Sequence, residues 1–210
     1  LTRGYVTKNP ARGIVGPKRS RPLPQFLRES EMNRLLDDMP VGDSYRELLA
    51  YIIVLVFYST GMRLAELVGL DDDNIDFDTR VIKVLGKGSK QRLIPFADEL
   101  EEGLRIYVAR RDAEVVRKDK AFFVDQRGQR VKRGAVQNSV RASLAKVTSM
   151  KKRSPHVLRH TFATAMLNNE AGLESVKKLL GHESLSTTEI YTHTTFEQLK
   201  KIYDKAHPRA

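Results

Sequence analysis

The longest apolar run of the sequence, from Leu48 to Tyr58, sets the strongest limit on how this chain folds. It falls well short of the ~18–20 apolar residues that a helix needs to span a bilayer. We therefore expect a helix over about 44–59 that is buried inside a globular domain. Hydrophobic residues make up 40% of the 210 residues, which allows the sizeable core that such a helix requires.

Other helices are predicted around this one. Ser30, followed by Glu31 and an apolar periodicity, indicates the N-cap of a preceding helix. Gly61 separates the buried helix from a short helix that ends near Leu67. After Pro95 the pattern is again helical, over about 97–117, 133–148, 156–169, 173–180, 186–192 and 195–206.

One small antiparallel sheet is expected between the helices. The segments 81–85 and 91–95 are apolar and flank Gly86-Lys87-Gly88-Ser89-Lys90. Two strands joined by a glycine-rich turn are typical of a β-hairpin. Residues 74–78 supply a third, short strand. The fold class predicted from the pattern is mainly α with a small three-stranded antiparallel sheet.

The first 24 residues differ in composition from the rest. They carry four prolines with arginine and lysine between them, and proline prevents a regular helix. We predict a basic linker over 1–24. Because the sequence starts at Leu1 inside this linker, we expect another domain upstream in the natural protein.

The charge balance limits the class of partner. Lys and Arg number 37 against 26 Asp and Glu, which gives a net charge of +11. Such a balance favours a polyanionic partner, with nucleic acid ahead of an anionic membrane surface. Cysteine is absent, which excludes disulfides and thiolate metal sites and is compatible with a reducing compartment. No signal pattern is visible, so we expect a cytoplasmic protein.

Two short motifs each allow a structural and a functional interpretation. In Thr60-Gly61-Met62-Arg63-Leu64-Ala65-Glu66-Leu67, Arg63 and Glu66 could form an ordinary helix-surface pair. The turn with Lys87 is not a nucleotide-binding P-loop, because Gly88 stands where Ser or Thr is required. It is either a plain polar turn or a tip whose glycines let Lys87 approach a phosphate closely.

The motif His156-Val157-Leu158-Arg159-His160 has two histidines at the spacing of a zinc site. Val157 occupies the place of the catalytic glutamate of a metalloprotease, and Arg159 would set a cation beside the metal. We therefore expect no metal. His156 and Arg159 share one face at a helix start, which suits an oxyanion.

A last motif joins Leu179-Leu180-Gly181-His182 to Tyr191-Thr192-His193. Taken alone, His182 could be a polar helix cap and Tyr191 a half-buried aromatic residue.

Together these motifs resemble the tyrosine recombinases, the phage integrase family. The resemblance covers about residues 24–206. The motifs Thr-Gly-Met-Arg-x-x-Glu-Leu, Gly-Lys-Gly-x-Lys-x-Arg, His-x-Leu-Arg-His-Thr-Phe-Ala-Thr and Leu-Gly-His-x-Ser-x-x-Thr-Thr-x-x-Tyr-Thr-His are most similar to the Xer branch. Six positions match the family's catalytic set in order, namely Arg63, Lys87, His156, Arg159, His182 and Tyr191. The resemblance implies a catalytic domain over 25–194 and a C-terminal helix over 195–210.

The resemblance also implies a mechanism. Tyr191 attacks the scissile phosphate, releases a 5′-hydroxyl and forms a 3′-phosphotyrosyl bond, which keeps the energy of the phosphodiester without any cofactor. Arg63 and Arg159 would bind the non-bridging oxygens, and His182 would donate a further hydrogen bond.

Proton transfer is assigned by the same resemblance. Lys87 would be the general acid for the leaving oxygen and His156 the proton acceptor near Tyr191. Glu66 would orient Arg63 or His156, and His160 would either support the site or only pack.

Partners follow from the same resemblance. A double-stranded recombination site would be bound, with contacts expected from Lys90, Arg92, Lys151, Lys152 and Arg153. The C-terminal helix would either pack on its own domain or link protomers into a tetramer. The family allows two roles, chromosome dimer resolution with an accessory DNA translocase and the integration of a mobile element. A type IB topoisomerase and a DNA-binding protein without catalysis remain as alternatives.

Overall fold

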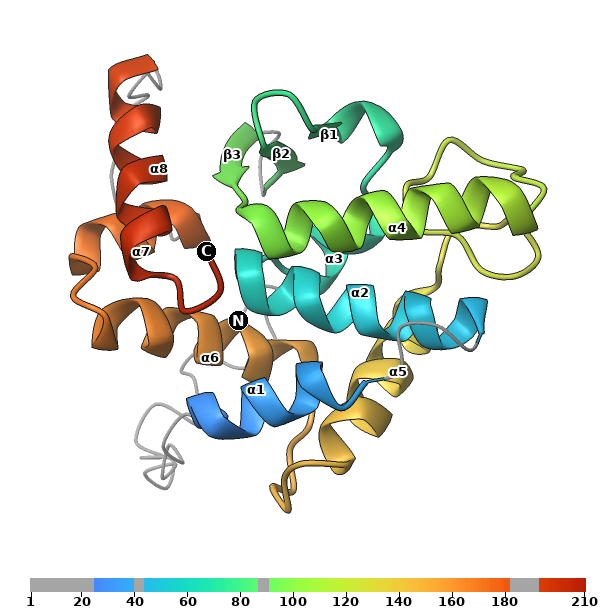
Figure 1. Cartoon of the computed structure of the whole chain (residues 1–210), viewed down its shortest axis with the longest axis horizontal. Helices are drawn as coiled ribbons and strands as arrows, with labels where there is room; N and C mark the ends of the chain where they lie inside the picture. Colours follow the sequence, from blue (N-terminus) through green and yellow to red (C-terminus); the bar gives the residue numbers. More distant parts are fainter. Residues whose placement is uncertain (1–24, 40–43, 87–90, 182–192) are drawn as a thin grey trace, which may run out of the picture.

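The computed structural model describes residues 25–39, 44–86, 91–181 and 193–210, and these form a mainly helical body with one small sheet (Figure 1). The helices are α1 (Glu29–Asp37), α2 (Tyr45–Thr60), α3 (Leu64–Val68), α4 (Asp98–Glu114), α5 (Arg133–Ala145), α6 (Pro155–Asn168), α7 (Leu173–Leu180) and α8 (His193–Ala206). A 3-10 turn, η1 (Asp72–Asn74), precedes the strands β1 (Ile75–Asp76), β2 (Val81–Leu85) and β3 (Gln91–Pro95).

Helix α2 is the buried helix that the apolar run predicts. The Ser44 side chain caps its start by accepting a hydrogen bond from the Glu47 amide at 3.2 Å, and Gly61 ends it with a left-handed φ of 59°. Leu48, Ile52 and Leu55 are fully buried. Helices α4, α5 and α6 pack around α2, so its apolar surface is covered on several sides (Figure 1).

The sheet agrees closely with the predicted hairpin. Strands β2 and β3 are antiparallel and pair Val81 with Pro95 and Val84 with Arg92. Strand β1 pairs with β2 and is shorter than the predicted third strand, since it includes only Ile75 and Asp76. The turn 87–90 lies outside the described residues.

The predicted helix ends are less accurate than the helices themselves. The prediction of Ser30 as an N-cap is wrong, because Arg28 takes that position and its amide donates to Glu31 Oε2 at 2.9 Å. Helix α4 stops at Glu114 and α5 at Ala145, both before the predicted ends. The chain turns to extended backbone at Val115, whose side chain is buried in the core. The predicted helix over 186–192 lies outside the described part of the chain.

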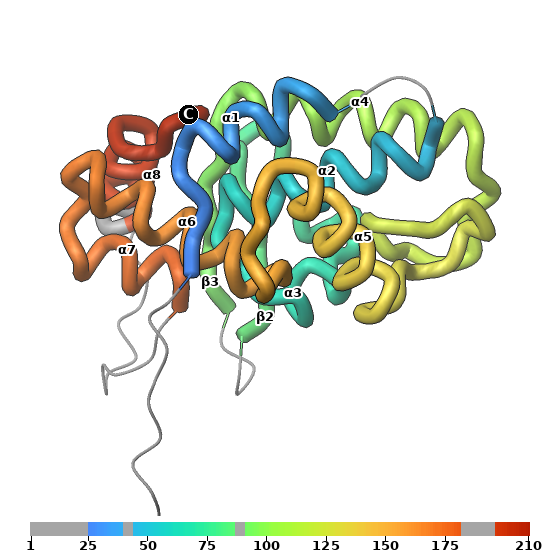
Figure 2. The backbone as a smooth tube through the Cα atoms, turned by 90° about the horizontal axis from the view of Figure 1, so that it is seen from below, coloured from blue at the N-terminus to red at the C-terminus, as the bar shows by residue number. Residues whose placement is uncertain are grey.

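The C-terminal helix packs on its own domain. Tyr203 and Ala206 of α8 join Phe162 of α6 and Leu179 of α7 in a second apolar cluster. After α8 the chain returns to α1, where Arg209 donates from Nη2 to Asp37 at 2.6 Å. Figure 2 shows the C-terminus beside α1. Exchange of α8 between protomers stays a prediction.

Among the described helices, every one is too short or too polar to cross a membrane.

Candidate active site

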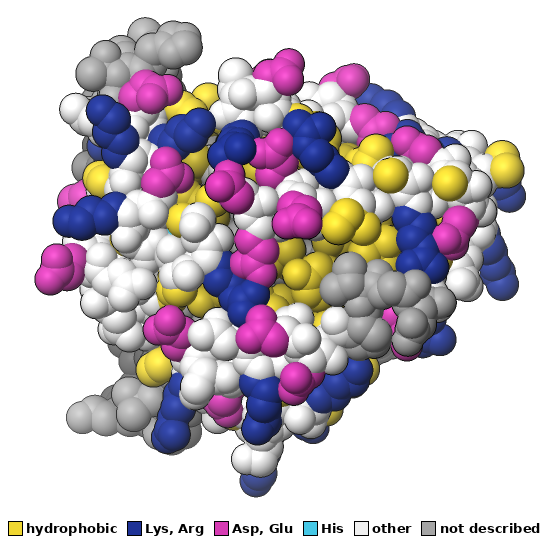
Figure 3. Space-filling view, viewed as in Figure 1, with side chains coloured by type: hydrophobic (Ala, Val, Ile, Leu, Met, Phe, Trp, Pro, Cys, Tyr) yellow, Lys and Arg dark blue, Asp and Glu magenta, His cyan; other side chains and the backbone are white. Residues whose placement is uncertain are grey.

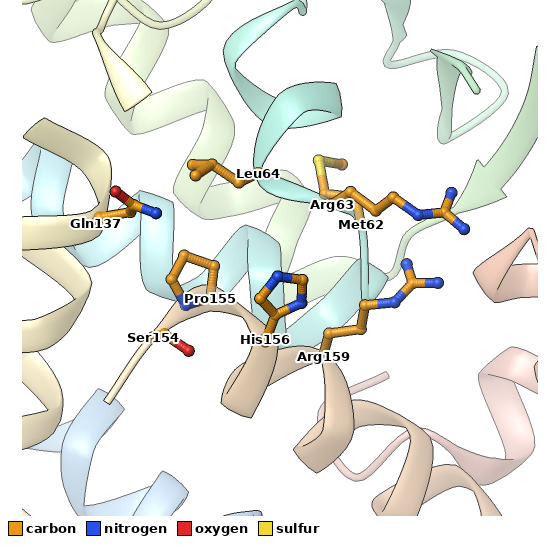
Figure 4. Close-up of a pocket in the computed structure, with 8 residues that line it drawn as sticks. All are labelled: Met62, Arg63, Leu64, Gln137, Ser154, Pro155, His156 and Arg159. Carbon is orange, nitrogen blue, oxygen red and sulfur yellow. The ribbon is translucent and has the colours of Figure 1, made fainter. Parts of the chain in front are cut away.

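Arg63 and Arg159 come from different elements and meet at one pocket. Arg63 is the N-cap of α3, and Arg159 lies in the first turns of α6. In Figure 4 their guanidinium groups lie close together and point the same way, with the His156 ring beside Arg159. The pocket is lined by Met62, Arg63, Leu64, Gln137, Ser154, Pro155, His156 and Arg159.

Backbone carbonyls hold both arginines in place. Arg159 donates from Nη1 to Gly61 O at 2.5 Å and from Nη2 to Leu180 O at 2.8 Å. Arg63 donates from Nη2 to Gly181 O at 3.0 Å and from Nη1 to Glu66 Oε1 at 2.9 Å. A guanidinium carries five N–H groups. Within the part of the chain that the structure describes, these bonds therefore leave N–H groups on each arginine for an anion.

Glu66 is the carboxylate at the centre of this arrangement. Its two oxygens accept two bonds from Arg92, at 2.6 and 2.8 Å, and two from Arg63, one of them from the Arg63 amide at 2.6 Å. Burial alone would raise the pKa of Glu66, but the hydrogen bonds and charge of Arg92, supported by Arg63, lower it below its ordinary value. Of the two partners predicted for Glu66, Arg63 is the one it contacts in the structure.

Positive charge is in excess here. Among the described residues, Arg63, Arg92 and Arg159 stand against the carboxylate of Glu66. Burial, followed by repulsion from Arg63 and Arg92, lowers the pKa of Arg159 to about 10. A bound anion would relieve this repulsion, so the electrostatics of the pocket favour a phosphate-like ligand.

The two histidines of α6 differ in position. Both are exposed, but only His156 lines the pocket. The spacing of these two histidines in the sequence would also suit a zinc site. In the described part of the chain, no group of three or more His, Cys, Asp or Glu side chains able to hold a metal occurs. His156 lies beside Arg159 at the pocket, which is the arrangement that an oxyanion site would need.

Arg92 requires a correction. Its place in the hairpin motif predicts a contact with DNA, but its side chain is buried and the residue is only 6% exposed. All three of its guanidinium nitrogens donate inside the protein, to Glu66 and to Leu179 O. The alternation of β3 explains this, because Arg92 shares a sheet face with buried Ile94.

Three other predicted DNA contacts lie in the loop before α6. Lys151 and Lys152 are exposed, and Arg153 is partly buried. Lys87, Lys90, His182 and Tyr191 lie outside the described residues, so the structure brings together only three of the six predicted catalytic positions, Arg63, His156 and Arg159.

Two polar residues that line the pocket were not predicted as site residues from the sequence. Ser154 precedes Pro155 at the start of α6, a position typical of an N-cap that could have been noticed. Gln137 belongs to α5 and lines the pocket from beyond Pro155 (Figure 4). Nothing in its local pattern distinguishes it from any exposed helix residue.

Comparison with known proteins places this chain and its fold among DNA recombinases. The profile of the phage integrase family matches residues 25–198. The tyrosine recombinase XerC of Corynebacterium glutamicum is 40% identical over 207 residues, which are 99% of this chain and 67% of that protein. The XerC of Chlorobaculum tepidum is 38% identical over 231 residues, which cover 100% of this chain and 69% of that protein.

Solved structures give the same picture. The crystal structure of XerA recombinase matches with a TM-score of 0.68 and 32% identity over 89% of this chain and 66% of that one. The XerH site-specific recombinase bound to its difH substrate, in a post-cleavage complex, matches with a TM-score of 0.68 and 26% identity over 85% of this chain and 52% of that one. This chain thus spans about two thirds of the length of the curated relatives.

Proposed function

The chain belongs to the phage integrase family, and on that premise we propose that it is the catalytic domain of a site-specific tyrosine recombinase. The observation that carries this proposal is the pair Arg63 and Arg159, anchored by carbonyl groups with N–H groups left over, in a pocket that His156 also lines. Planar guanidinium groups match the geometry of phosphate oxygens. The relatives do not favour a topoisomerase or a DNA-binding protein without catalysis.

Strand cleavage on this site would proceed in one displacement. The Tyr191 oxygen forms a bond to phosphorus while the bond from phosphorus to the 5′-oxygen breaks. Arg63 and Arg159 stabilise the charge that develops on the non-bridging oxygens. An ordinary tyrosine has a pKa near ~10, so surrounding cations are needed to make it nucleophilic at neutral pH.

Two proton transfers accompany the displacement. The Tyr191 proton passes to His156, and Lys87 gives a proton to the departing 5′-oxygen. His182 donates a further hydrogen bond to the phosphate. Rejoining is the same sequence in reverse, with the 5′-hydroxyl as nucleophile, and it needs no external energy because the phosphotyrosyl bond conserves it.

The proposed substrate is duplex DNA with a specific recombination site. The exposed Lys151 and Lys152 lie shortly before the pocket residues Ser154 and Pro155 in the chain, where they would meet phosphates beside the scissile one. XerH, which this fold matches, is bound to its difH substrate. Assembly into a tetramer through α8, an accessory translocase and a role in chromosome dimer resolution are finer parts of this proposal.

Covalent trapping tests the proposal. After the recombination site has been mapped by protection of host DNA with the full-length protein, a nicked suicide duplex of that site is incubated with wild-type protein and Tyr191→Phe. We expect a protein adduct on the 3′ side of the break for the wild type and none for the variant, which should still bind because only one oxygen is lost. Tyr51→Phe, which removes a tyrosine hydroxyl in α2, is the control and should form the adduct. An adduct that mass spectrometry locates on another tyrosine contradicts the assignment.

A further inference from the structure

Three successive carbonyl groups at the end of α7 each accept a hydrogen bond from a different arginine. Leu179 O accepts from Arg92 Nε at 3.1 Å, Leu180 O from Arg159 Nη2 at 2.8 Å and Gly181 O from Arg63 Nη2 at 3.0 Å. The last carbonyls of a helix have no partner within the helix, and cations are favourable there. The end of α7 is thus tied directly to the phosphate-binding pair.

Arg92 differs from the other two arginines because it does not line the pocket. Its Nη1 and Nη2 atoms donate to the two oxygens of Glu66 at 2.6 and 2.8 Å, while its Nε atom donates to Leu179 O. Since Glu66 also binds Arg63, Arg92 is the bridge between the arginine of α3 and the end of α7.

The fit between Arg92 and α7 is close. Gly181 has a left-handed φ of 64°, and a Cβ added there would meet Arg92 Cδ at 3.0 Å and Nη1 at 3.1 Å. Glycine at this position therefore serves two needs, the backbone conformation and the space for the Arg92 side chain. A shift of the Arg92 side chain would therefore disturb the backbone of Gly181, the residue before His182 in the chain.

We propose that Arg92 is a positioning residue for strand cleavage, which holds the end of α7 in register with Arg63 and Arg159. This inference rests on the proposed function. Along the chain, His182 follows Gly181 at once and Tyr191 follows later. Arg92 fixes where this stretch starts relative to the two arginines that bind the phosphate.

Arg92→Lys tests geometry and leaves charge unchanged. Lysine keeps one positive charge beside Glu66, but its single ammonium group cannot bind both Glu66 oxygens in the planar arrangement and also reach Leu179 O. Small misplacements of reacting groups can slow a reaction on the order of 10²-fold. We expect a loss of that size in the cleavage rate, with DNA affinity close to the wild-type value because Arg92 is buried.

Arg111→Lys is the matched control. Arg111 is 2% exposed and donates to Asp72, to Asp112 and to the carbonyl of Phe122. It lies near the far end of α4, away from α7 (Figure 1). This substitution removes similar buried bonds and should destabilise the protein to a similar degree without slowing cleavage.

The experiment compares wild type, Arg92→Lys and Arg111→Lys in the full-length protein. Single-turnover adduct formation on the nicked duplex gives the cleavage rate, a gel-shift titration gives the affinity, and hydrogen exchange over 176–181 reports on the end of α7. The proposal expects slower cleavage and faster exchange for Arg92→Lys alone.

Two results overturn the positioning role. One is a hydrogen-exchange rate over 176–181 in Arg92→Lys that equals the wild-type rate. The other is a loss of cleavage rate in Arg111→Lys as large as that in Arg92→Lys, which would indicate general destabilisation. A wild-type protein that forms no adduct overturns the proposed function instead, and the exchange measurement then shows only whether Arg92 holds the end of α7 in place.

Discussion

At the scale of single residues, the pocket depends on how arginine divides its N–H groups. Arg63 and Arg159 each use some of them on carbonyl or carboxylate oxygens and retain the rest. Lysine could not do both, since its compact ammonium lacks the planar fork. The side chains are therefore fixed before any phosphate arrives, and less conformational entropy is lost on binding.

A single-residue prediction separates Lys87 from the arginines. Lys87→Ala should slow cleavage of ordinary DNA by on the order of 10²-fold or more, as expected for loss of a general acid. On a duplex with sulfur in place of the bridging 5′-oxygen, the leaving thiolate needs no proton, so the Lys87→Ala rate should return close to the wild-type rate. Single-turnover cleavage of both substrates measures this.

Arg159→Ala is the comparison in the same assay. Arg159 stabilises charge on the non-bridging oxygens whichever atom leaves, so sulfur should not restore its cleavage to the same degree. If the sulfur substrate leaves Lys87→Ala as slow as ordinary DNA does, Lys87 only anchors the hairpin and the general-acid role must be withdrawn.

At the scale of elements, local pattern predicted some features and missed others. The apolar run predicts α2, and alternation with a glycine turn predicts the pairing of β2 and β3. The end of α4 has no strong stop signal, since it depends on Val115 turning into the core. The predicted end of α4 is too late because this contact of Val115 with the core is made by the fold and is not visible in the local sequence.

The candidate site shows the same division between local and distant information. Arg63, His156 and Arg159 were recognised because each lies in a motif. The bond between Arg92 and Glu66 was missed, because the partners are 26 residues apart and no local pattern shows that a buried arginine has a carboxylate nearby. The alternation of buried and exposed residues in β3 indicates that Arg92 is buried, but it does not indicate that Glu66 is its partner.

The packing of α8 centres on a buried histidine just beyond its end. The His207 ring stacks on Tyr203 with centroids 5.1 Å apart, and its Nε2 atom lies 3.3 Å from Tyr58 O. Its Nδ1 atom accepts a hydrogen bond from the Arg209 amide at 3.1 Å. Burial lowers the pKa of His207 to about 4. A proton added to Nδ1 would oppose the Arg209 amide.

This burial predicts acid sensitivity of the element. The unfolded chain binds a proton on His207 near pH ~6.5, whereas the folded protein binds it only near pH 4. As pH falls through this window the unfolded state holds more protons, so stability decreases, by about 2 kcal/mol between pH 8 and pH 5. Urea unfolding of wild type and His207→Gln at both pH values measures the difference. An equal pH dependence in the two proteins contradicts a buried neutral histidine.

At the scale of the whole molecule, the charges can be followed over one face. Figure 3 shows a face, with α4 across its front, where Lys and Arg lie interspersed with Asp and Glu. Charges on α4 are also paired, such as Arg105 with Glu101 at 2.8 Å. A face of mixed sign does not attract a polyanion. We expect DNA to bind on the side of the arginine pocket, beside Lys151 and Lys152.

That expectation can be measured through salt. Each phosphate contact made by a lysine or arginine adds about 0.9 to the slope of log affinity against log salt concentration. Lys151→Ala and Lys152→Ala should each reduce the slope of the full-length protein by up to about that amount and weaken binding to all sequences alike. Arg92→Gln removes the same formal charge from a buried position, so its slope should equal that of the wild type. Fluorescence anisotropy over a salt series gives the slopes. The slope records only the cations that displace counterions from the duplex. A reduced slope for Arg92→Gln, together with unchanged slopes for both lysine variants, would therefore mean that DNA contacts β3 and not the loop before α6.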